Sequence, residues 1–86
     1  MPSRTADDFD RAVAAYVRMT AAAKRISAAK IAERVGVPTN TFYRYWRGER
    51  TMGLSDLRAI FAELGVSFAE AEAEITRIYN AGEYTD

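Results

Sequence analysis

The sequence of 86 residues contains neither cysteine nor histidine. Their absence excludes disulfides, thiol nucleophiles, histidine general bases and the commonest zinc ligands. Catalysis would need a pair of carboxylates or an activated lysine instead, and Asp7, Asp8 and Asp10 are better placed as partners of a helix dipole. We therefore expect no enzyme, and neither a metal site nor a cofactor.

Long apolar runs are also missing from the sequence. No stretch approaches the length that spans a membrane, and the N-terminal residues MPSRTADDFD lack the basic and then apolar layout of a signal peptide. We expect no membrane partner and a cytoplasmic location. The short length predicts one domain over residues 1–86, with a loose arm at 1–4 and a loose tail at 83–86.

The chain has no net charge, because 12 Lys and Arg balance 12 Asp and Glu. The charges are nevertheless unevenly distributed. Residues 24–50 hold seven cations and two carboxylates, whereas residues 51–86 hold two cations and seven carboxylates. This asymmetry is typical of separate binding and non-binding faces, although solvated helix faces that segregate by chance are the alternative.

A stretch of 22 residues from position 27, SAAKIAERVGVPTNTFYRYWRG, predicts two short helices joined by a tight turn. Apolar residues recur at helical spacing up to Val35, and Gly36 can take the left-handed backbone of a sharp turn. Val37 is expected to point inward and fill the corner. Pro38 suits the first turn of the second helix, because its φ is fixed and it has no N–H.

The second of these helices is predicted to have two different faces. Phe42 and Tyr45, three residues apart, are expected to face the core. Trp46, at the end of the helix, is expected to pack on Leu54 or on the first helix. The outward side then carries hydroxyl, amide, phenol and guanidinium groups, as reading a DNA major groove requires. These outward residues are Thr39, Asn40, Tyr43, Arg44 and Arg47.

The pattern IAxxVGVxxxTFxRxxxG over residues 31–48 is followed by LxxIFxxLGVS over residues 57–67. Together they resemble the Cro/C1-type helix-turn-helix family of phage and bacterial repressors, over roughly residues 8 to 80. The sequence departs from the family at Ala28, where the family often has Gln, and at Pro38, where Ser or Thr is frequent. Without that Gln, phosphate anchoring must come from other residues.

The resemblance implies an all-α fold, a compact bundle of about five helices with a central helix-turn-helix, like the λ-repressor DNA-binding domain. It also implies a sequence-specific regulator of transcription that binds double-stranded DNA, a Cro-like or immunity-type repressor that acts by occluding its operator. Such a protein would associate with the nucleoid. No small-molecule ligand is evident.

The residues suggest a division of roles on DNA. Arg44 can make a bidentate bond to guanine and Asn40 the equivalent bond to adenine, while Thr39 and Tyr43 offer neighbouring contacts. Four cations are candidates for phosphate contacts, although a solvated surface is the alternative for the first two. They are Lys30, Arg34, Arg47 and Arg50.

The remaining helices are predicted from caps and apolar stripes. A first helix of about eighteen residues is expected after Ser3 or Thr5, with Lys24 near its end and Ser27 capping the next helix. Its apolar stripe is Phe9, Val13, Tyr16, Val17 and Thr20. A helix opened by Gly53 is expected to bury Leu54, Leu57, Ile60, Phe61 and Leu64.

The last predicted helix opens with a capping box formed by Ser67 and Glu70. Part of its apolar stripe must close the core, and the remainder is a candidate face for a homodimer, in which relatives often pair through this region. The candidate face is Phe68, Ile75, Ile78 and Tyr79.

A second function class is a protein-interaction module, such as an antitoxin-like or adaptor domain on the same scaffold. The zero net charge, Ala28 and the acidic last helix support it. Salt dependence separates the two classes, because phosphate contacts make affinity fall steeply with added salt.

Overall fold

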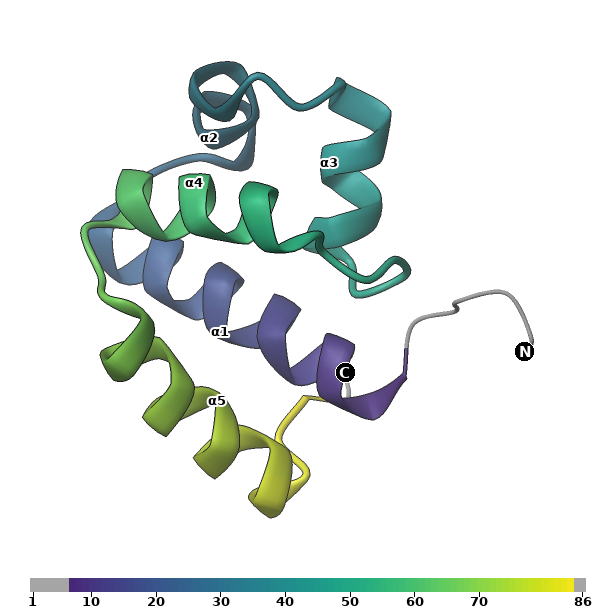
Figure 1. The fold of residues 1–86 in the computed structure, drawn as a ribbon, viewed down its shortest axis with the longest axis vertical. Helices are drawn as coiled ribbons and strands as arrows, with labels where there is room; N and C mark the ends of the chain where they lie inside the picture. Colours follow the sequence, from purple (N-terminus) through teal and green to yellow (C-terminus); the bar gives the residue numbers. More distant parts are fainter. Residues whose placement is uncertain (1–6, 85–86) are drawn as a thin grey trace.

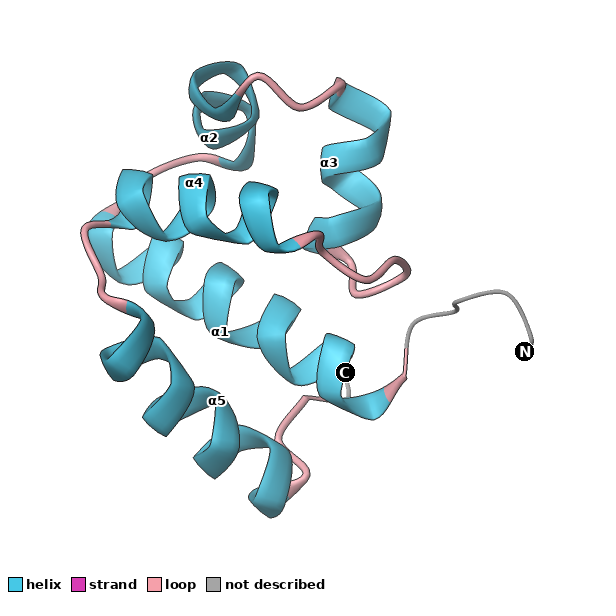
Figure 2. Ribbon diagram, in the orientation of Figure 1, coloured by secondary structure: helices cyan, strands magenta, loops and turns pink. Residues whose placement is uncertain are grey.

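The computed structural model describes residues 7–84, in which all regular structure is helical (Figures 1 and 2). This confirms the prediction of an all-α bundle of about five helices. The elements are α1 (Asp8–Lys24), α2 (Ala28–Val35), α3 (Thr39–Trp46), α4 (Leu54–Leu64) and α5 (Phe68–Ala81).

Helix α1 is the central element of the bundle. It packs against α3, α4 and α5, while α2 packs against α3 and α4 (Figure 1). In this arrangement α5 lies on one side of α1, and the α2–α3 pair lies on the other. The helix-turn-helix therefore sits at one end of the molecule, away from α5.

Every helix contributes side chains to one hydrophobic core. Burying such a side chain contributes about 1.5–3 kcal/mol each, so these residues dominate the stability of a chain this short. Phe42 and Tyr45 on α3 are buried as predicted, as are Ile60, Phe61 and Leu64 on α4. Leu57 is only partly buried, and Leu54 is 74% exposed, so its assignment to the core was wrong. Phe9 is 45% exposed as well. The largest fully buried side chains are Val17, Ile31, Phe42, Ile60, Leu64 and Ile78.

The helix termini are held largely by the predicted signals. Ser27 accepts a bond from the Lys30 N–H, and Ser67 and Glu70 form their capping box. At α1 the cap is Asp7, whose carboxylate accepts the Asp10 N–H at 3.0 Å. The caps expected at Ser3 and Thr5 lie outside the described residues. The acidic residues 7 and 10 thus act as a capping box, because each side chain bonds the other's backbone N–H.

The turn between α2 and α3 has the predicted glycine geometry. Gly36 adopts φ 73°, in the left-handed region, and Val37 is only 9% exposed. Pro38 differs from the prediction, since it precedes α3 as its N-cap with ψ 139° rather than joining the first turn. Proline has no side-chain acceptor, so α3 receives no hydrogen bond from the side chain of its N-cap residue.

Residues 83 and 84, predicted as part of a loose tail, make side-chain contacts with α5. Arg77 bonds Glu83 at 3.0 Å, and the Tyr84 ring stacks on Tyr79 with centroids 6.2 Å apart. Residues 83 and 84 are therefore packed against α5, and the rest of the expected tail lies outside the described residues. The arm expected at residues 1–4 also lies outside them.

Candidate nucleic-acid interface

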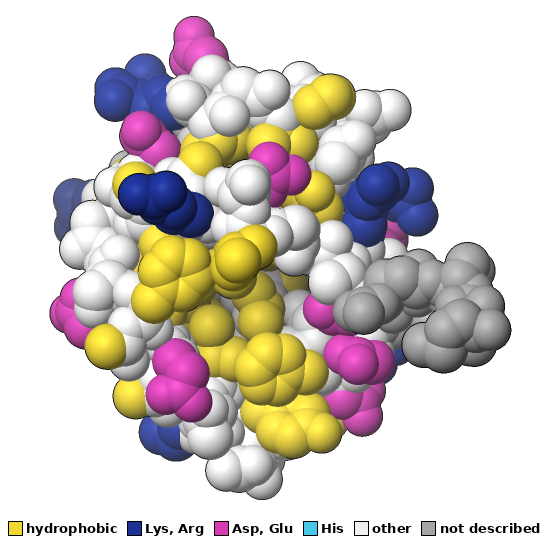
Figure 3. Space-filling view, viewed as in Figure 1, with side chains coloured by type: hydrophobic (Ala, Val, Ile, Leu, Met, Phe, Trp, Pro, Cys, Tyr) yellow, Lys and Arg dark blue, Asp and Glu magenta, His cyan; other side chains and the backbone are white. Residues whose placement is uncertain are grey.

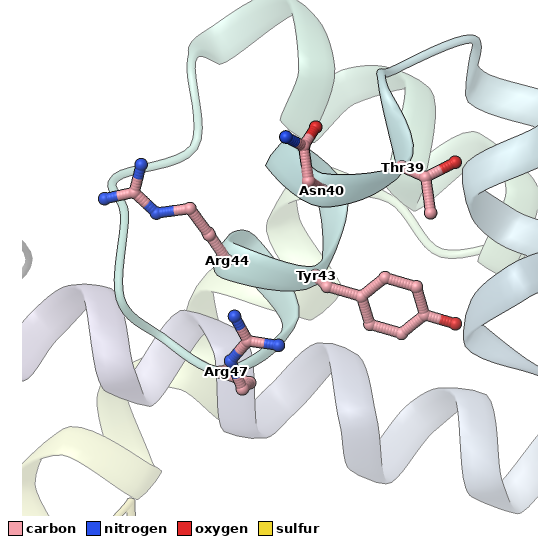
Figure 4. A pocket seen from close by; sticks show the side chains of 5 residues that line it. All are labelled: Thr39, Asn40, Tyr43, Arg44 and Arg47. Carbon is pink, nitrogen blue, oxygen red and sulfur yellow. The ribbon is translucent and has the colours of Figure 1, made fainter.

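The outward face of α3 forms one shallow hollow, lined by Thr39, Asn40, Tyr43, Arg44 and Arg47 (Figure 4). The opposite face of the same helix is buried, with Phe42 1% and Tyr45 5% exposed. The structure thus brings together the four residues predicted to read bases, and adds Arg47 from the predicted phosphate contacts. A two-faced helix of this kind can be inserted into a groove without disturbing the core.

The side chains of this face point in different directions. Figure 4 shows Arg44 and Tyr43 extending to opposite sides of α3, with Thr39 and Asn40 at its N-terminal end. Tyr43 is half-buried, and its ring lies edge-on to Phe42 with centroids 6.0 Å apart. The Asn40 Oδ1 accepts the Thr41 N–H at 3.0 Å, so its NH₂ group remains available as a donor.

The two cations of this face differ in their electrostatic surroundings. Arg47 forms a two-point ion pair with Glu49, with Nε–Oε2 at 2.9 Å and Nη2–Oε1 at 3.3 Å. The bond from Arg47 lowers the pKa of the Glu49 carboxyl. In the described part of the chain, the Arg44 guanidinium has no such ion pair. Arg44 therefore offers its donors to a ligand directly, whereas Arg47 must first leave Glu49.

A second hollow lies at the N-terminal end of α2. It is lined by Arg25, Ile26, Ser27, Lys30, Arg34 and Glu63. Lys30 and Arg34 are thus brought together as predicted, and the Arg34 Nη1 lies 3.7 Å from the Glu63 Oε1. Arg25, which follows α1, was missed because the sequence shows no link between it and α2. Arg50 lines neither hollow.

A partly buried hydrogen bond connects the inner face of α3 to α4. The Tyr45 hydroxyl donates to the Asp56 Oδ2 at 2.6 Å. Burial raises the pKa of the Tyr45 phenol, and the bond to the Asp56 carboxylate raises it further. The bond holds the inner face of α3 against the first turn of α4.

Tyr45→Phe is expected to lower the free energy of unfolding by about 1–3 kcal/mol at neutral pH, because a bond to a charged acceptor is lost. The raised pKa also sets the direction of the pH dependence. The unfolded chain loses the phenol proton first, so this stabilisation is complete below pH 10 and disappears as the pH rises through the folded pKa. Urea unfolding at pH 7 and above pH 10 measures both effects.

Tyr16→Phe is the matched control for this variant, because Tyr16 is equally buried and its hydroxyl bonds no described residue. Equal losses of stability in the two variants, or an unchanged alkaline transition in Tyr45→Phe, would contradict the role of the Tyr45–Asp56 bond.

Apolar side chains gather on a different face, over α1, α4 and α5 (Figure 3). We call this the apolar face; its groove is lined by Phe9, Val13, Leu54, Leu57, Phe61, Phe68, Glu72 and Ile75. Of the four residues proposed for a dimer face, Ile75 is 4% and Ile78 0% exposed, so both belong to the core. Phe68 and Tyr79 remain on the surface, at 44% and 42% exposed.

No helix within residues 7–84 is long and apolar enough to cross a membrane. In the same range, no group of three Asp or Glu side chains is arranged to hold a metal ion.

The family model described as "Cro/C1-type HTH DNA-binding domain" matches residues 17–73. The matched residues include all of α2, α3 and α4 and every residue that lines either hollow. No curated protein and no solved structure matches the chain.

Proposed function

Because the chain belongs to the Cro/C1-type helix-turn-helix DNA-binding family, we propose that it is a sequence-specific transcriptional repressor that occludes its operator. The observation that carries this proposal is the outward face of α3, where four polar or cationic side chains share a hollow with Arg47. With α3 in the major groove, the bound protein would block polymerase or a competing regulator from the same site.

Arg44 and Asn40 are the principal base-reading residues in this proposal. Arg44 donates two bonds to the O6 and N7 of a guanine, and Asn40 pairs with an adenine, each worth about 1–3 kcal/mol of discrimination. Asn40 must release the Thr41 N–H to use its Oδ1, because that oxygen is occupied in the free protein. Thr39 and Tyr43 contact neighbouring bases or sugars.

The phosphate contacts are assigned to Lys30, Arg34, Arg47 and Arg50. Arg34 and Arg47 pair with Glu63 and Glu49 in the free protein. Because exposed ion pairs of this kind are weak, exchanging a carboxylate for a phosphate has a small cost. The acidic helix α5 lies across α1 from α3, so its carboxylates would be directed away from the DNA (Figure 1).

The protein is further proposed to bind as a homodimer. The burial of Ile75 and Ile78 moves the candidate interface to the apolar face, where Phe9 and Tyr79 are in edge-on ring contact with centroids 5.4 Å apart. Two copies related by a two-fold axis would read two half-sites, which predicts a palindromic operator.

Selection of bound duplexes from a random-sequence pool tests the function. The selected duplex is then titrated with the protein at several salt concentrations. Recovery of one motif, with affinity that falls steeply as salt rises, supports groove reading, and two-fold symmetry in the motif supports the dimer. Absence of any enriched motif would contradict the proposal.

The apolar face favours a second candidate function, a protein-interaction module. Phe9, Leu54 and Phe68 are exposed at 45%, 74% and 44% and line one groove. Contiguous exposed apolar surface often marks an interaction site. In this case the protein would show no salt-dependent binding to any duplex, and the same titration separates the two functions.

A further inference from the structure

One bond connects the centre of α1 to the end of α3. The Arg18 Nη1 donates to the carbonyl oxygen of Trp46 at 2.6 Å, and the contact is partly buried. Trp46 is the last residue of α3. The last carbonyl groups of a helix lack partners within the helix and carry partial negative charge, so a guanidinium is a favourable donor for them.

Helix α3 has little local support of its own. It contains eight residues, and the side chain of its N-cap residue, Pro38, bonds none of its N–H groups. Isolated helices of this length are marginal in water, because few hydrogen bonds compensate the cost of nucleation. The placement of α3 must therefore come from its contacts with α1 and α2.

The segment after α3 follows α1 closely. Gly48 adopts φ 76°, and a Cβ at this position would lie 3.3 Å from the Arg11 Cα. Further along, the Thr51 hydroxyl donates to the Asp10 Oδ2 at 2.8 Å. These contacts hold the loop after α3 against α1, whereas the Arg18 bond is made to the last residue of α3 itself.

Arg44 lies two residues before Trp46, so it is carried by the same helical turn that Arg18 holds. We propose that Arg18 is a positioning residue. Its bond to the Trp46 carbonyl fixes the C-terminal end of α3 and thereby orients Arg44 toward the DNA base that it contacts. This proposal rests on the proposed function. Arg18 is half-buried and engaged with a carbonyl, unlike the exposed Arg44 and Arg47. Its contribution is to discrimination between sequences, while the phosphate contacts remain with the exposed cations.

The test compares Arg18→Met, which removes the donor, with Arg18→Lys, which keeps a charged donor. Lys24→Met is the control for charge, because Lys24 also lies on α1 and makes no described bond to α3. The first measurement is the fluorescence and near-ultraviolet dichroism of Trp46, the sole tryptophan, without DNA. The second is the affinity ratio between the selected duplex and a scrambled duplex.

We expect Arg18→Met to change the Trp46 signal and to lower the affinity ratio about tenfold, the effect of losing one bond to a charged group. Binding to the scrambled duplex and its salt slope should stay unchanged. Arg18→Lys should retain most of the Trp46 signal and of the affinity ratio, and Lys24→Met should match the original protein in both. Far-ultraviolet dichroism shows whether each variant is folded; if Arg18→Met is not, Arg18→Gln, with its neutral donor, takes its place.

Two results would overturn the proposal. One is a folded Arg18→Met with an unchanged Trp46 signal and affinity ratio. The other is an equal loss for both duplexes with a flatter salt slope, which would make Arg18 a phosphate contact. If the original protein bound no duplex, the proposed function would fall, whereas a changed Trp46 signal in Arg18→Met would still support the placement of α3 by Arg18.

Discussion

Arg44→Ala is expected to abolish most of the preference for the selected duplex while leaving binding to unrelated duplexes nearly intact. The Arg44 guanidinium lies in the hollow on the outward face of α3 and has no ion pair in the described part of the chain. A bidentate bond to guanine contributes about 1–3 kcal/mol, so the specific affinity should fall roughly 5- to 150-fold. Competition titrations with selected and scrambled duplexes measure the change.

Arg50→Ala is the comparison for this variant, since Arg50 is an exposed cation outside the hollow. As a phosphate contact, it should weaken binding to both duplexes by a similar factor and lower the salt slope by about one. Equal weakening of both duplexes by Arg44→Ala would show that Arg44 contacts phosphate rather than a base.

Phe42→Ala should destabilise the protein more than any substitution on its surface. Phe42 is 1% exposed, and its ring contacts those of Tyr43 and Trp46, at centroid distances of 6.0 and 5.9 Å. Truncating a buried phenylalanine costs about 3–5 kcal/mol, because apolar area is lost and a cavity remains. In a chain of this size, the midpoint of thermal unfolding should fall by about 15 °C or more.

Phe68→Ala is the matched control, because the same side chain is removed where it is 44% exposed. Its ring still contacts Phe61 with centroids 5.2 Å apart, so we expect a smaller loss of about 1 kcal/mol. Thermal unfolding followed by circular dichroism compares the two variants. A loss in Phe42→Ala no larger than in Phe68→Ala would contradict the assignment of Phe42 to the core.

Arg44 and Phe42 lie on opposite faces of α3, so Arg44→Ala and Phe42→Ala should weaken DNA binding for different reasons. Arg44→Ala removes a contact from a helix that keeps its place. Phe42→Ala removes part of the packing that holds the helix, so specific binding should weaken together with stability. Comparing binding at a temperature where Phe42→Ala is still folded separates these two causes.

The elements that the sequence predicted well depend on neighbours along the chain. The 3.6-residue period identified the buried Phe42 and Tyr45, and the Ser67–Glu70 pair predicted its capping box. Gly36 predicted the left-handed turn of the helix-turn-helix. Because side chains three and four positions apart share a helix face, the grouping on the outward face of α3 also followed from spacing alone.

The predictions that failed for α4 and α5 concerned the burial of side chains, which depends on which helices pack together. Leu54 continues the apolar stripe of α4, yet it is 74% exposed and lines the groove of the apolar face. Ile75 and Ile78 share a stripe with Phe68, but α1 covers the two isoleucines and leaves part of Phe68 on the surface. A stripe shows which side of a helix is apolar, whereas its neighbours decide how much of it is buried.

By itself, the sequence determined the helical fold, the helix-turn-helix and the composition of its outward face, because periodicity, caps and turn residues act over a few positions. Only the tertiary structure decided which cations are paired, that α1 covers Ile75 and Ile78, and that Arg18 bonds the end of α3 across 28 positions. These contacts join residues far apart in the chain, and their formation depends on the packing of the whole bundle rather than on any local preference.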